Sequence, residues 1–152
     1  YAFSDSKNPK VLSLTRQDLD YLDFDVKYEE FLKGGYVVSD GDDFTLVASG
    51  SELEIAFKIK AALLEYSVRI ISVPILNKLS NMKNEEINEL LKNKHVFPIE
   101  LGRSIGWESY LGRITKTFSI DSFGESAPIE DLEKNFGFDV PTITKEIIKY
   151  LN

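Results

Sequence analysis

The stretch FTLVASGSE at positions 44–52, followed by VRIISVP at 68–74, decides the fold. Each stretch contains a short apolar run rich in β-branched residues, which favours a buried strand. Between the two runs, apolar residues recur at helical spacing from position 51 to 64, so this segment is predicted to be a helix. A strand, a helix and a strand in this order require a parallel pairing, with a crossover that is right-handed in nearly all proteins.

The same alternation continues on both sides of this unit. Further strands are predicted at 36–38, 95–101 and 114–120, and further helices at 84–93, 105–111, 128–136 and 140–151. Strands that alternate with helices are typical of a sheet covered by helices on both faces. The sequence therefore predicts the α/β class, as a three-layer domain around a mainly parallel five-stranded sheet.

The first 35 residues lack this regularity. Residues 1–8 are polar and are expected to form a helix tail or loop, and 10–15 are expected to form a short strand. Acidic residues and aromatics are mixed without a period over 18–30, which favours an irregular connector, with an acidic interaction patch as the alternative. Two glycines at 34 and 35 mark a boundary, and the compact domain is predicted to start near Gly34.

Composition limits the classes of function. The chain has 152 residues, no cysteine, one histidine (His95) and a formal net charge of −7. Disulfides and cysteine or multi-histidine metal sites are therefore excluded. The excess of negative charge argues against a nucleic-acid partner. There is no apolar run of membrane-spanning length and no signal-peptide pattern, so we expect a cytoplasmic domain without a membrane partner.

The turn between the predicted strand at 44–48 and the helix that follows it is a candidate anion site. Gly50 and Ser51 open the helix, where free amides and the helix dipole attract negative charge. The structural alternative is that Gly50 permits a tight turn while Ser51 caps the helix, with Glu54 completing a capping box.

Three other groups have a structural and a functional interpretation. His95 is either a general base or a structural histidine at the start of a strand. The acidic residues 40–43 resemble part of a calcium loop but lack its other ligands, so a hairpin turn is predicted. Trp107 and Tyr110 are one helical turn apart and are predicted to pack in the core or an interface rather than against a cofactor.

Two further segments lie at predicted carboxyl ends of strands. Arg16 follows the strand at 10–15, and an arginine at such an edge suits a phosphate, although a solvated surface arginine is the alternative. The loop at 123–128 follows another strand, and its structural interpretation is a turn before a helix that begins with proline.

Six segments resemble one family, in the order in which that family has them. They are LTRQD at 14–18, KGGYV at 33–37, LVASGSE at 46–52, VRIISVP at 68–74, FGESAP at 123–128 and NFGF at 135–138. Together they are similar to the C-terminal part of a transketolase. The chain departs from the family pattern at Thr15, Asp18 and Ser49, which replace Ser, Asn and Thr. The segment 77–83 is not matched.

The resemblance implies a domain division and a parent activity. Residues 1–26 would end the pyrimidine-binding domain, 27–33 would be a linker, and 34–152 would form the transketolase C-terminal domain. A transketolase is a homodimer that transfers a two-carbon ketol unit from a ketose phosphate to an aldose phosphate in the pentose phosphate pathway. It uses thiamine diphosphate and a divalent metal, Mg²⁺ or Ca²⁺.

The resemblance also implies which functions this chain lacks. The cofactor and metal ligands and the catalytic residues would lie upstream, so no catalytic, cofactor-binding or metal-binding residue is expected here. Arg16 alone matches an active-site position, where it would bind the substrate phosphate. The isolated chain is expected to be inactive, and its strand at 10–15, without its usual partner, is expected to be disordered, refolded or paired with another copy.

The alternative to an enzyme part is a binding or dimer-interaction module. In that interpretation the turn at 49–51 and the loop at 123–128 would form one crevice for a nucleotide or another anion at the sheet edge.

Overall fold

The structure is a computed structural model that describes residues 7–152. The strands are β1 (Tyr36–Ser39), β2 (Phe44–Ala48), β3 (Val68–Ser72), β4 (His95–Glu100) and β5 (Phe118–Ser119). The α-helices are α1 (Tyr28–Lys33), α2 (Glu52–Ala62), α3 (Asn84–Leu91), α4 (Trp107–Leu111), α5 (Ile129–Asn135) and α6 (Val140–Leu151). A 3₁₀ helix, η1 (Leu76–Asn81), precedes α3.

The strands form one sheet in the order β1-β3-β2-β4-β5. The central strand β2 is parallel to both β3 and β4, and β5 is parallel to β4. Only β1, at one edge of this sheet, is antiparallel to its neighbour β3. The prediction of a mainly parallel five-stranded sheet is therefore confirmed, as is the parallel crossover from β2 through α2 to β3.

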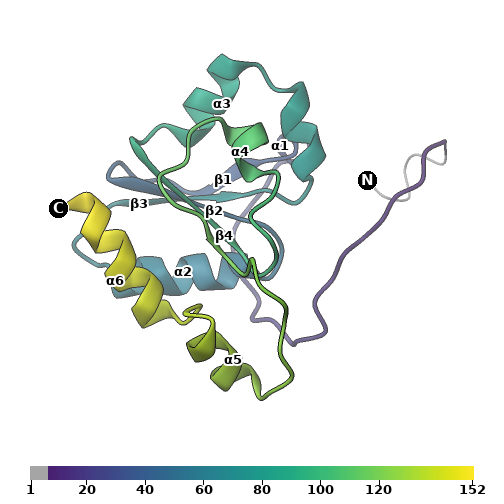
Figure 1. The fold of residues 1–152 in the computed structure, drawn as a ribbon. Helices are drawn as coiled ribbons and strands as arrows, with labels where there is room; N and C mark the ends of the chain where they lie inside the picture. Colours follow the sequence, from purple (N-terminus) through teal and green to yellow (C-terminus); the bar gives the residue numbers. More distant parts are fainter. Residues whose placement is uncertain (1–6) are drawn as a thin grey trace.

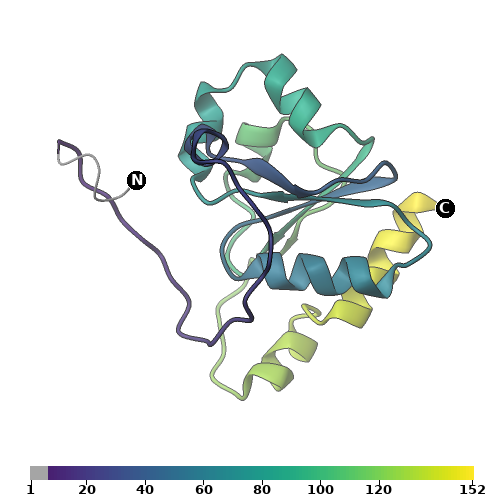
Figure 2. The ribbon, with the colours of Figure 1, turned by 180° about the vertical axis from the view of Figure 1, so that it is seen from behind.

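Helices cover both faces of the sheet (Figures 1 and 2). Helices α2, α5 and α6 lie on one face, and α1, α3 and α4 lie on the other. Because side chains alternate along a strand, β2 contributes Phe44, Leu46 and Ala48 to the core under α2 and α6. Its Val47 points to the opposite core, which Ile87, Leu91 and Trp107 share. The three predicted layers thus enclose two hydrophobic cores.

The predicted hairpin at 39–43 is wrong. Strands β1 and β2 follow each other in the sequence, but β3 lies between them in the sheet. The connecting loop crosses the amino end of β3, and a Cβ atom at Gly41 would overlap the backbone of Val68 and Arg69. Turn residues favour a reversal of the chain, but they do not determine whether the two strands pair.

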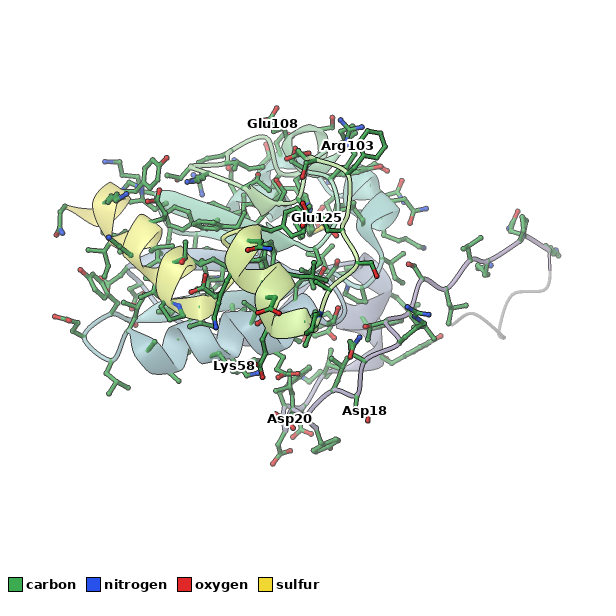
Figure 3. All side chains as sticks on the ribbon, turned by 60° about the horizontal axis from the view of Figure 1, so that its bottom comes forward. Asp18, Asp20, Lys58, Arg103, Glu108 and Glu125 are labelled. Atoms are coloured by element: carbon green, nitrogen blue, oxygen red, sulfur yellow. The ribbon has the colours of Figure 1, made fainter. Side chains whose placement is uncertain are left out.

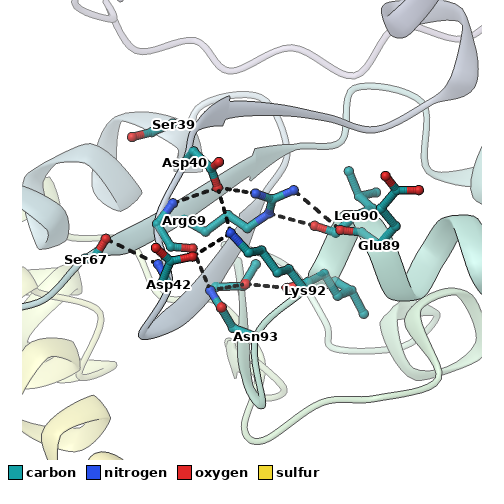
Figure 4. A network of polar contacts seen from close by, with 12 residues as sticks. Ser39, Asp40, Asp42, Ser67, Arg69, Glu89, Leu90, Lys92 and Asn93 are labelled. Atoms are coloured by element: carbon teal, nitrogen blue, oxygen red, sulfur yellow. Dashed lines mark hydrogen bonds and ion pairs between the residues drawn. The ribbon is translucent and has the colours of Figure 1, made fainter.

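Buried polar contacts hold this loop in place (Figure 4). The Arg69 side chain pairs with Asp40, and its Nε donates to the carbonyl oxygen of Leu90 at 2.8 Å. The side-chain amide of Asn93 donates to the carbonyl oxygen of Gly41 at 3.0 Å and to Thr45 Oγ1 at 3.2 Å. These contacts join the β1–β2 loop, the start of β3 and the end of α3.

The N-terminal segment differs from the expectation of a strand. Residues 10–15 have no regular secondary structure, and the Val11 and Leu14 side chains are 94% and 79% exposed. Further along, Leu22 and Phe24 pack against the core under α2, with Phe24 stacked on Phe57 at 6.4 Å between ring centroids. The segment therefore attaches to the domain through its second half.

The bounds of other elements also differ from the predicted ones. Helix α1 begins inside the stretch that was predicted to be irregular up to residue 30. Strand β5 has only two residues, where 114–120 was predicted. A helix tail or loop was expected at 1–8, and residues 1–6 of this range lie outside the described residues. By contrast, α6 has the predicted bounds, and Asp139 caps it by accepting the Thr142 amide at 3.0 Å.

Replacing Arg69 with methionine is expected to destabilise the domain by about 2 kcal/mol, because two carbonyl groups at the end of α3 lose a buried donor. Methionine keeps the apolar part of the side chain, so the loss reflects the guanidinium. The matched control is Lys92→Met, since Lys92 pairs with Asp42 at the surface and should contribute less than about 1 kcal/mol. Urea unfolding followed by circular dichroism measures both, and equal losses would contradict this role for Arg69.

Candidate functional site

The carboxyl ends of β2 and β4 form the candidate site. These strands are neighbours and parallel, with Ala48 beside Ile99 at this end. The helix that follows β2 (α2) and the helix that follows β4 (α4) lie on opposite faces of the sheet (Figure 1). Where two connections diverge in this way, an α/β sheet leaves a crevice in which ligands usually bind.

The turn after β2 differs from the expected cap. Gly50 has a φ of 55°, which favours glycine, whereas Ser51 already has helical dihedral angles and makes no side-chain cap. The Ser51 hydroxyl donates to Glu52 Oε2 at 2.9 Å, and the Glu54 side chain pairs with Lys58. The predicted capping box is therefore wrong, because the carboxylate of Glu52 takes the serine hydroxyl instead.

Glu52 lies at the centre of the site. This residue is only 6% exposed, and its Oε1 accepts the backbone N–H of Leu101 at 2.8 Å. The first residue of α2 is thereby joined to the loop that follows β4. Glu52 was not among the residues predicted from the sequence, although its position directly after a strand-to-helix turn was the available signal.

Glu100, the last residue of β4, brings a second carboxyl group to this edge. Its Oε2 accepts the indole N–H of Trp107 at 3.3 Å. Burial raises the pKa of the Glu100 carboxyl, and the negative charge of Glu52 raises it further, while the Trp107 hydrogen bond acts in the opposite direction. Glu52 and Glu100, which we call the carboxyl pair, are therefore electrostatically coupled. They are 48 positions apart in sequence, so only the sheet register could reveal the pair.

The carboxyl pair bears on the candidate anion site at Gly50 and Ser51. An added anion at this turn would lie near two carboxyl groups, and it would compete with Glu52 for the Ser51 hydroxyl. The anion site stays a prediction, and the local charge counts against it.

An open, largely apolar cavity of about 400 Å³ lies between the β4–α4 loop and α5. It is lined by that loop, by the loop after β5 and by α5; the lining residues are Leu101, Gly102, Arg103, Ile120, Ser122, Gly124, Glu125, Ile129, Leu132, Glu133, Phe136 and Phe138. The loop at 123–128 thus lies at the carboxyl edge, as predicted. The turn at 49–51 does not contribute to this cavity, because β4 separates β2 from β5.

Other candidates lie away from this edge. His95 begins β4 beside Phe44, at the opposite end of the sheet, and its ring stacks on Phe97 at 6.4 Å. It therefore cannot act at the carboxyl edge. Trp107 is 1% exposed, which confirms the prediction of a packed side chain.

Arg16 lies in the N-terminal segment, where its side chain is exposed. The same segment contacts α2 further along, since the Asp20 amide donates to Glu54 Oε2 at 3.5 Å. Figure 3 shows Asp18 and Asp20 near Lys58, across the molecule from Arg103 and Glu108. The structure thus brings together Gly50, Ser51, Glu52 and Glu100, and it does not join Arg16 to them.

Residues 7–152 contain no group of three or more His, Cys, Asp or Glu side chains that could hold a metal ion. Within the same range, none of the helices has the length and apolar character that crossing a bilayer requires.

Comparison with known sequences identifies a domain and longer relatives. Residues 34–139 match the family described as the transketolase-like C-terminal domain. The chain is 35% identical to the transketolase of Bacillus subtilis over 99% of its own length, which is 24% of that protein. It is also 35% identical to the chloroplastic transketolase of Solanum tuberosum, over 90% of the chain and 20% of that protein. The chain therefore spans about a quarter or less of these relatives.

A solved structure agrees with the sequence matches. The transketolase of Leishmania mexicana superposes on 78% of the chain with a TM-score of 0.68 and 31% identity, and the match covers 18% of that protein. The α/β fold seen in the sheet order is thus the fold of a segment of that transketolase.

Replacing Glu52 with alanine is expected to destabilise the domain by about 1–3 kcal/mol, because the Leu101 amide loses its acceptor in a buried setting. Glu54→Ala, two residues along the same helix, is the matched control and should cost less than about 1 kcal/mol, since it removes one i,i+4 pair with Lys58 and a long contact of 3.5 Å to the Asp20 amide. Thermal or urea unfolding of both variants provides the measurement. A Glu52→Ala protein as stable as the control would show that this link between α2 and the β4–α4 loop contributes nothing.

Proposed function

The chain belongs to the transketolase family through its C-terminal domain, and we propose that it is part of an enzyme that transfers a two-carbon ketol unit from a ketose phosphate to an aldose phosphate. The observation that carries this proposal is 35% identity to a transketolase along 99% of the chain. The proposed pathway is the pentose phosphate pathway, the proposed location is the cytoplasm, and the proposed assembly is a homodimer.

The proposed division of the chain places the end of the pyrimidine-binding domain at 1–26, a linker at 27–33 and the C-terminal domain at 34–152. Three observations support it. The family match begins at residue 34, the segment 7–27 has no regular secondary structure, and large apolar side chains are exposed within it. Exposed apolar side chains in an extended segment are typical of a strand that has lost its neighbours.

The parent enzyme is proposed to use thiamine diphosphate and a divalent metal. The donor set of this chain does not fit the metal, since residues 7–152 bring no three candidate ligands together. We therefore assign no catalytic step through the cofactor to these residues, and propose that both groups are held by other parts of the parent.

Arg16 is proposed to bind the phosphate of the sugar substrate in the parent enzyme. An arginine guanidinium presents paired N–H donors that match phosphate oxygens. Its exposed side chain, which lies ahead of the part of the segment that packs on the domain, is compatible with a role toward another part of the parent.

The binding module that recognises an anion or nucleotide is the second proposal, and it has less support. The negative charge of the carboxyl pair lies beside Gly50 and Ser51, and the two loops of the proposed crevice are separated by the end of β4.

The purified 152-residue chain is expected to show no ketol transfer in a coupled assay with thiamine diphosphate and Mg²⁺, because the groups that hold the cofactor and the metal are proposed to lie in other parts of the parent. Protein captured from the source cells with an antibody against the chain is expected to be active under the same conditions. The complete Bacillus subtilis relative is the positive control. Captured protein without activity would overturn the proposed function, whereas turnover by the isolated chain would overturn the assignment of the catalytic groups to other parts.

Arg16→Ala in the complete enzyme is expected to raise KM for sugar phosphates by roughly tenfold or more, which corresponds to the loss of a charge-assisted contact of about 1.5–3 kcal/mol. Substrates without a phosphate group should be unaffected. Lys10→Ala, in the same segment, serves as the control. An equal rise in KM for phosphorylated and unphosphorylated substrates would contradict a phosphate contact at Arg16.

A further inference from the structure

The carboxyl pair has a feature that the proposed ketol transfer does not use. Two glutamates from different elements meet at the carboxyl edge, because the Glu52 carboxyl group contacts the amide of Leu101, the residue after Glu100. Glu52 is almost fully buried and Glu100 is partly buried. Burying two like charges close together is costly unless one of them is neutralised by a proton. The contacts around each carboxyl group determine which of the two takes up the proton.

Glu52 is the carboxyl group with the shorter hydrogen bonds. It accepts the Leu101 amide at 2.8 Å and the Ser51 hydroxyl at 2.9 Å, and hydrogen bonds of this kind stabilise a charged carboxylate. Glu100 accepts the indole N–H of Trp107 at 3.3 Å, and the Gly102 amide and the Ser49 hydroxyl also donate to it, but these contacts do not outweigh its burial and the charge of Glu52, so its pKa is raised. Glu100 is therefore the member of the pair that gains and loses a proton.

The groups that face Glu100 come from three elements. Glu52 on α2 is the charged group. The Ser49 side chain on the adjoining turn, the Gly102 amide on the following loop and the Trp107 indole on α4 donate hydrogen bonds to Glu100 and act against the rise of its pKa. Arg103, the nearest cation in sequence, has an exposed side chain whose Nε lies 3.9 Å from Asp121 Oδ1. The charge that opposes ionisation of Glu100 is thus that of Glu52.

We propose that the carboxyl pair is a pH-sensitive switch, in which a proton on Glu100 keeps the loop at 101–106 attached to α2 and the loss of that proton loosens the loop. The link is short, because Leu101, whose amide binds Glu52, is the residue next to Glu100. When both carboxyl groups are charged, their repulsion acts across this one connection.

The loop at 101–106 gives the switch a consequence at the surface. Leu101, Gly102 and Arg103 line the apolar cavity, and Ile105 is 72% exposed. The loop is also bound on its far side, where Asp121 accepts the Ser104 amide at 3.0 Å. Loosening its attachment to α2 therefore changes one wall of the cavity while the other end stays fixed.

The sign of the pH dependence follows from the direction of the shift. The pKa of Glu100 is raised in the folded protein, so the folded state binds more protons than the unfolded state just above the ordinary glutamate value of about 4.3. The stabilisation is complete below that value and is lost as the pH rises through the folded-state pKa. The loop is thus attached at the lower pH and loosened at the higher pH.

Trp107 is the only tryptophan of the chain and touches Glu100, so its emission reports the charge of that carboxyl group. The 152-residue chain is titrated from pH 4 to 8, with circular dichroism as a check that it stays folded. The expected result is an emission change with a midpoint above about 4.3. This change should be absent in Glu100→Gln and retained in Glu108→Gln, an exposed glutamate on α4.

Two further measurements separate the switch from a purely structural role. Glu52→Gln should move the midpoint to lower pH, because the opposing charge is removed. Hydrogen exchange at 101–106, corrected for the intrinsic pH effect, should accelerate above the midpoint, by up to about tenfold for each pH unit by which the midpoint exceeds 4.3. Carbon-13 NMR of the glutamate carboxyl groups gives the midpoint in the unsubstituted chain if a variant does not fold.

A flat emission of Trp107 in the folded chain would overturn the proposal. So would a transition that survives in Glu100→Gln, or loop exchange that stays constant across the midpoint. In the NMR measurement, the absence of a glutamate that titrates above the ordinary range would have the same meaning.

Discussion

The buried Arg69 side chain holds together the loops at the amino end of the sheet. It does so through an ion pair and hydrogen bonds. The guanidinium donates hydrogen bonds to carbonyl groups at the end of α3 and pairs with the carboxylate of Asp40. The loops at the amino ends of the strands are therefore joined into one unit. A buried guanidinium is stable only where several acceptors surround it. Once these loops are closed on one another, the opposite end of the sheet is left for the turns after β2, β4 and β5.

The carboxyl edge has a different character from the amino edge. At the amino edge, opposite charges meet, since Arg69 pairs with Asp40 and Lys92 pairs with Asp42. At the carboxyl edge, two acidic groups meet, and an apolar cavity lies on the other side of the loop that follows Glu100. The family relationship identifies the domain to which this edge belongs, while the negative charge described at the edge comes from Glu52 and Glu100. Stability is therefore concentrated at one end of the strands and sensitivity to protons at the other.

Local patterns predicted most of the elements and fewer of the contacts. Strand β2 and helix α6 have the bounds that apolar spacing indicated, because each buries one clear set of side chains. The hairpin was wrong since turn residues carry no information about strand order. The cap at Ser51 was wrong because its neighbour Glu52 offered a better acceptor. The carboxyl pair could not be predicted without the register of β2 and β4, and Arg16 was selected through family resemblance, while its place among other parts stays a prediction.

The sheet order has a consequence for a chain that is synthesised from its N-terminus. Each strand pairing among the described residues involves β3 or a later strand, so neither β1 nor β2 has a partner until residue 68 is available. On the ribosome, the apolar run of β2 therefore emerges well before any strand that can cover its edges. Unpaired apolar strands are prone to aggregate. The interval between the synthesis of β2 and that of β3 is thus a period in which the unpaired edges of β2 are open to aggregation.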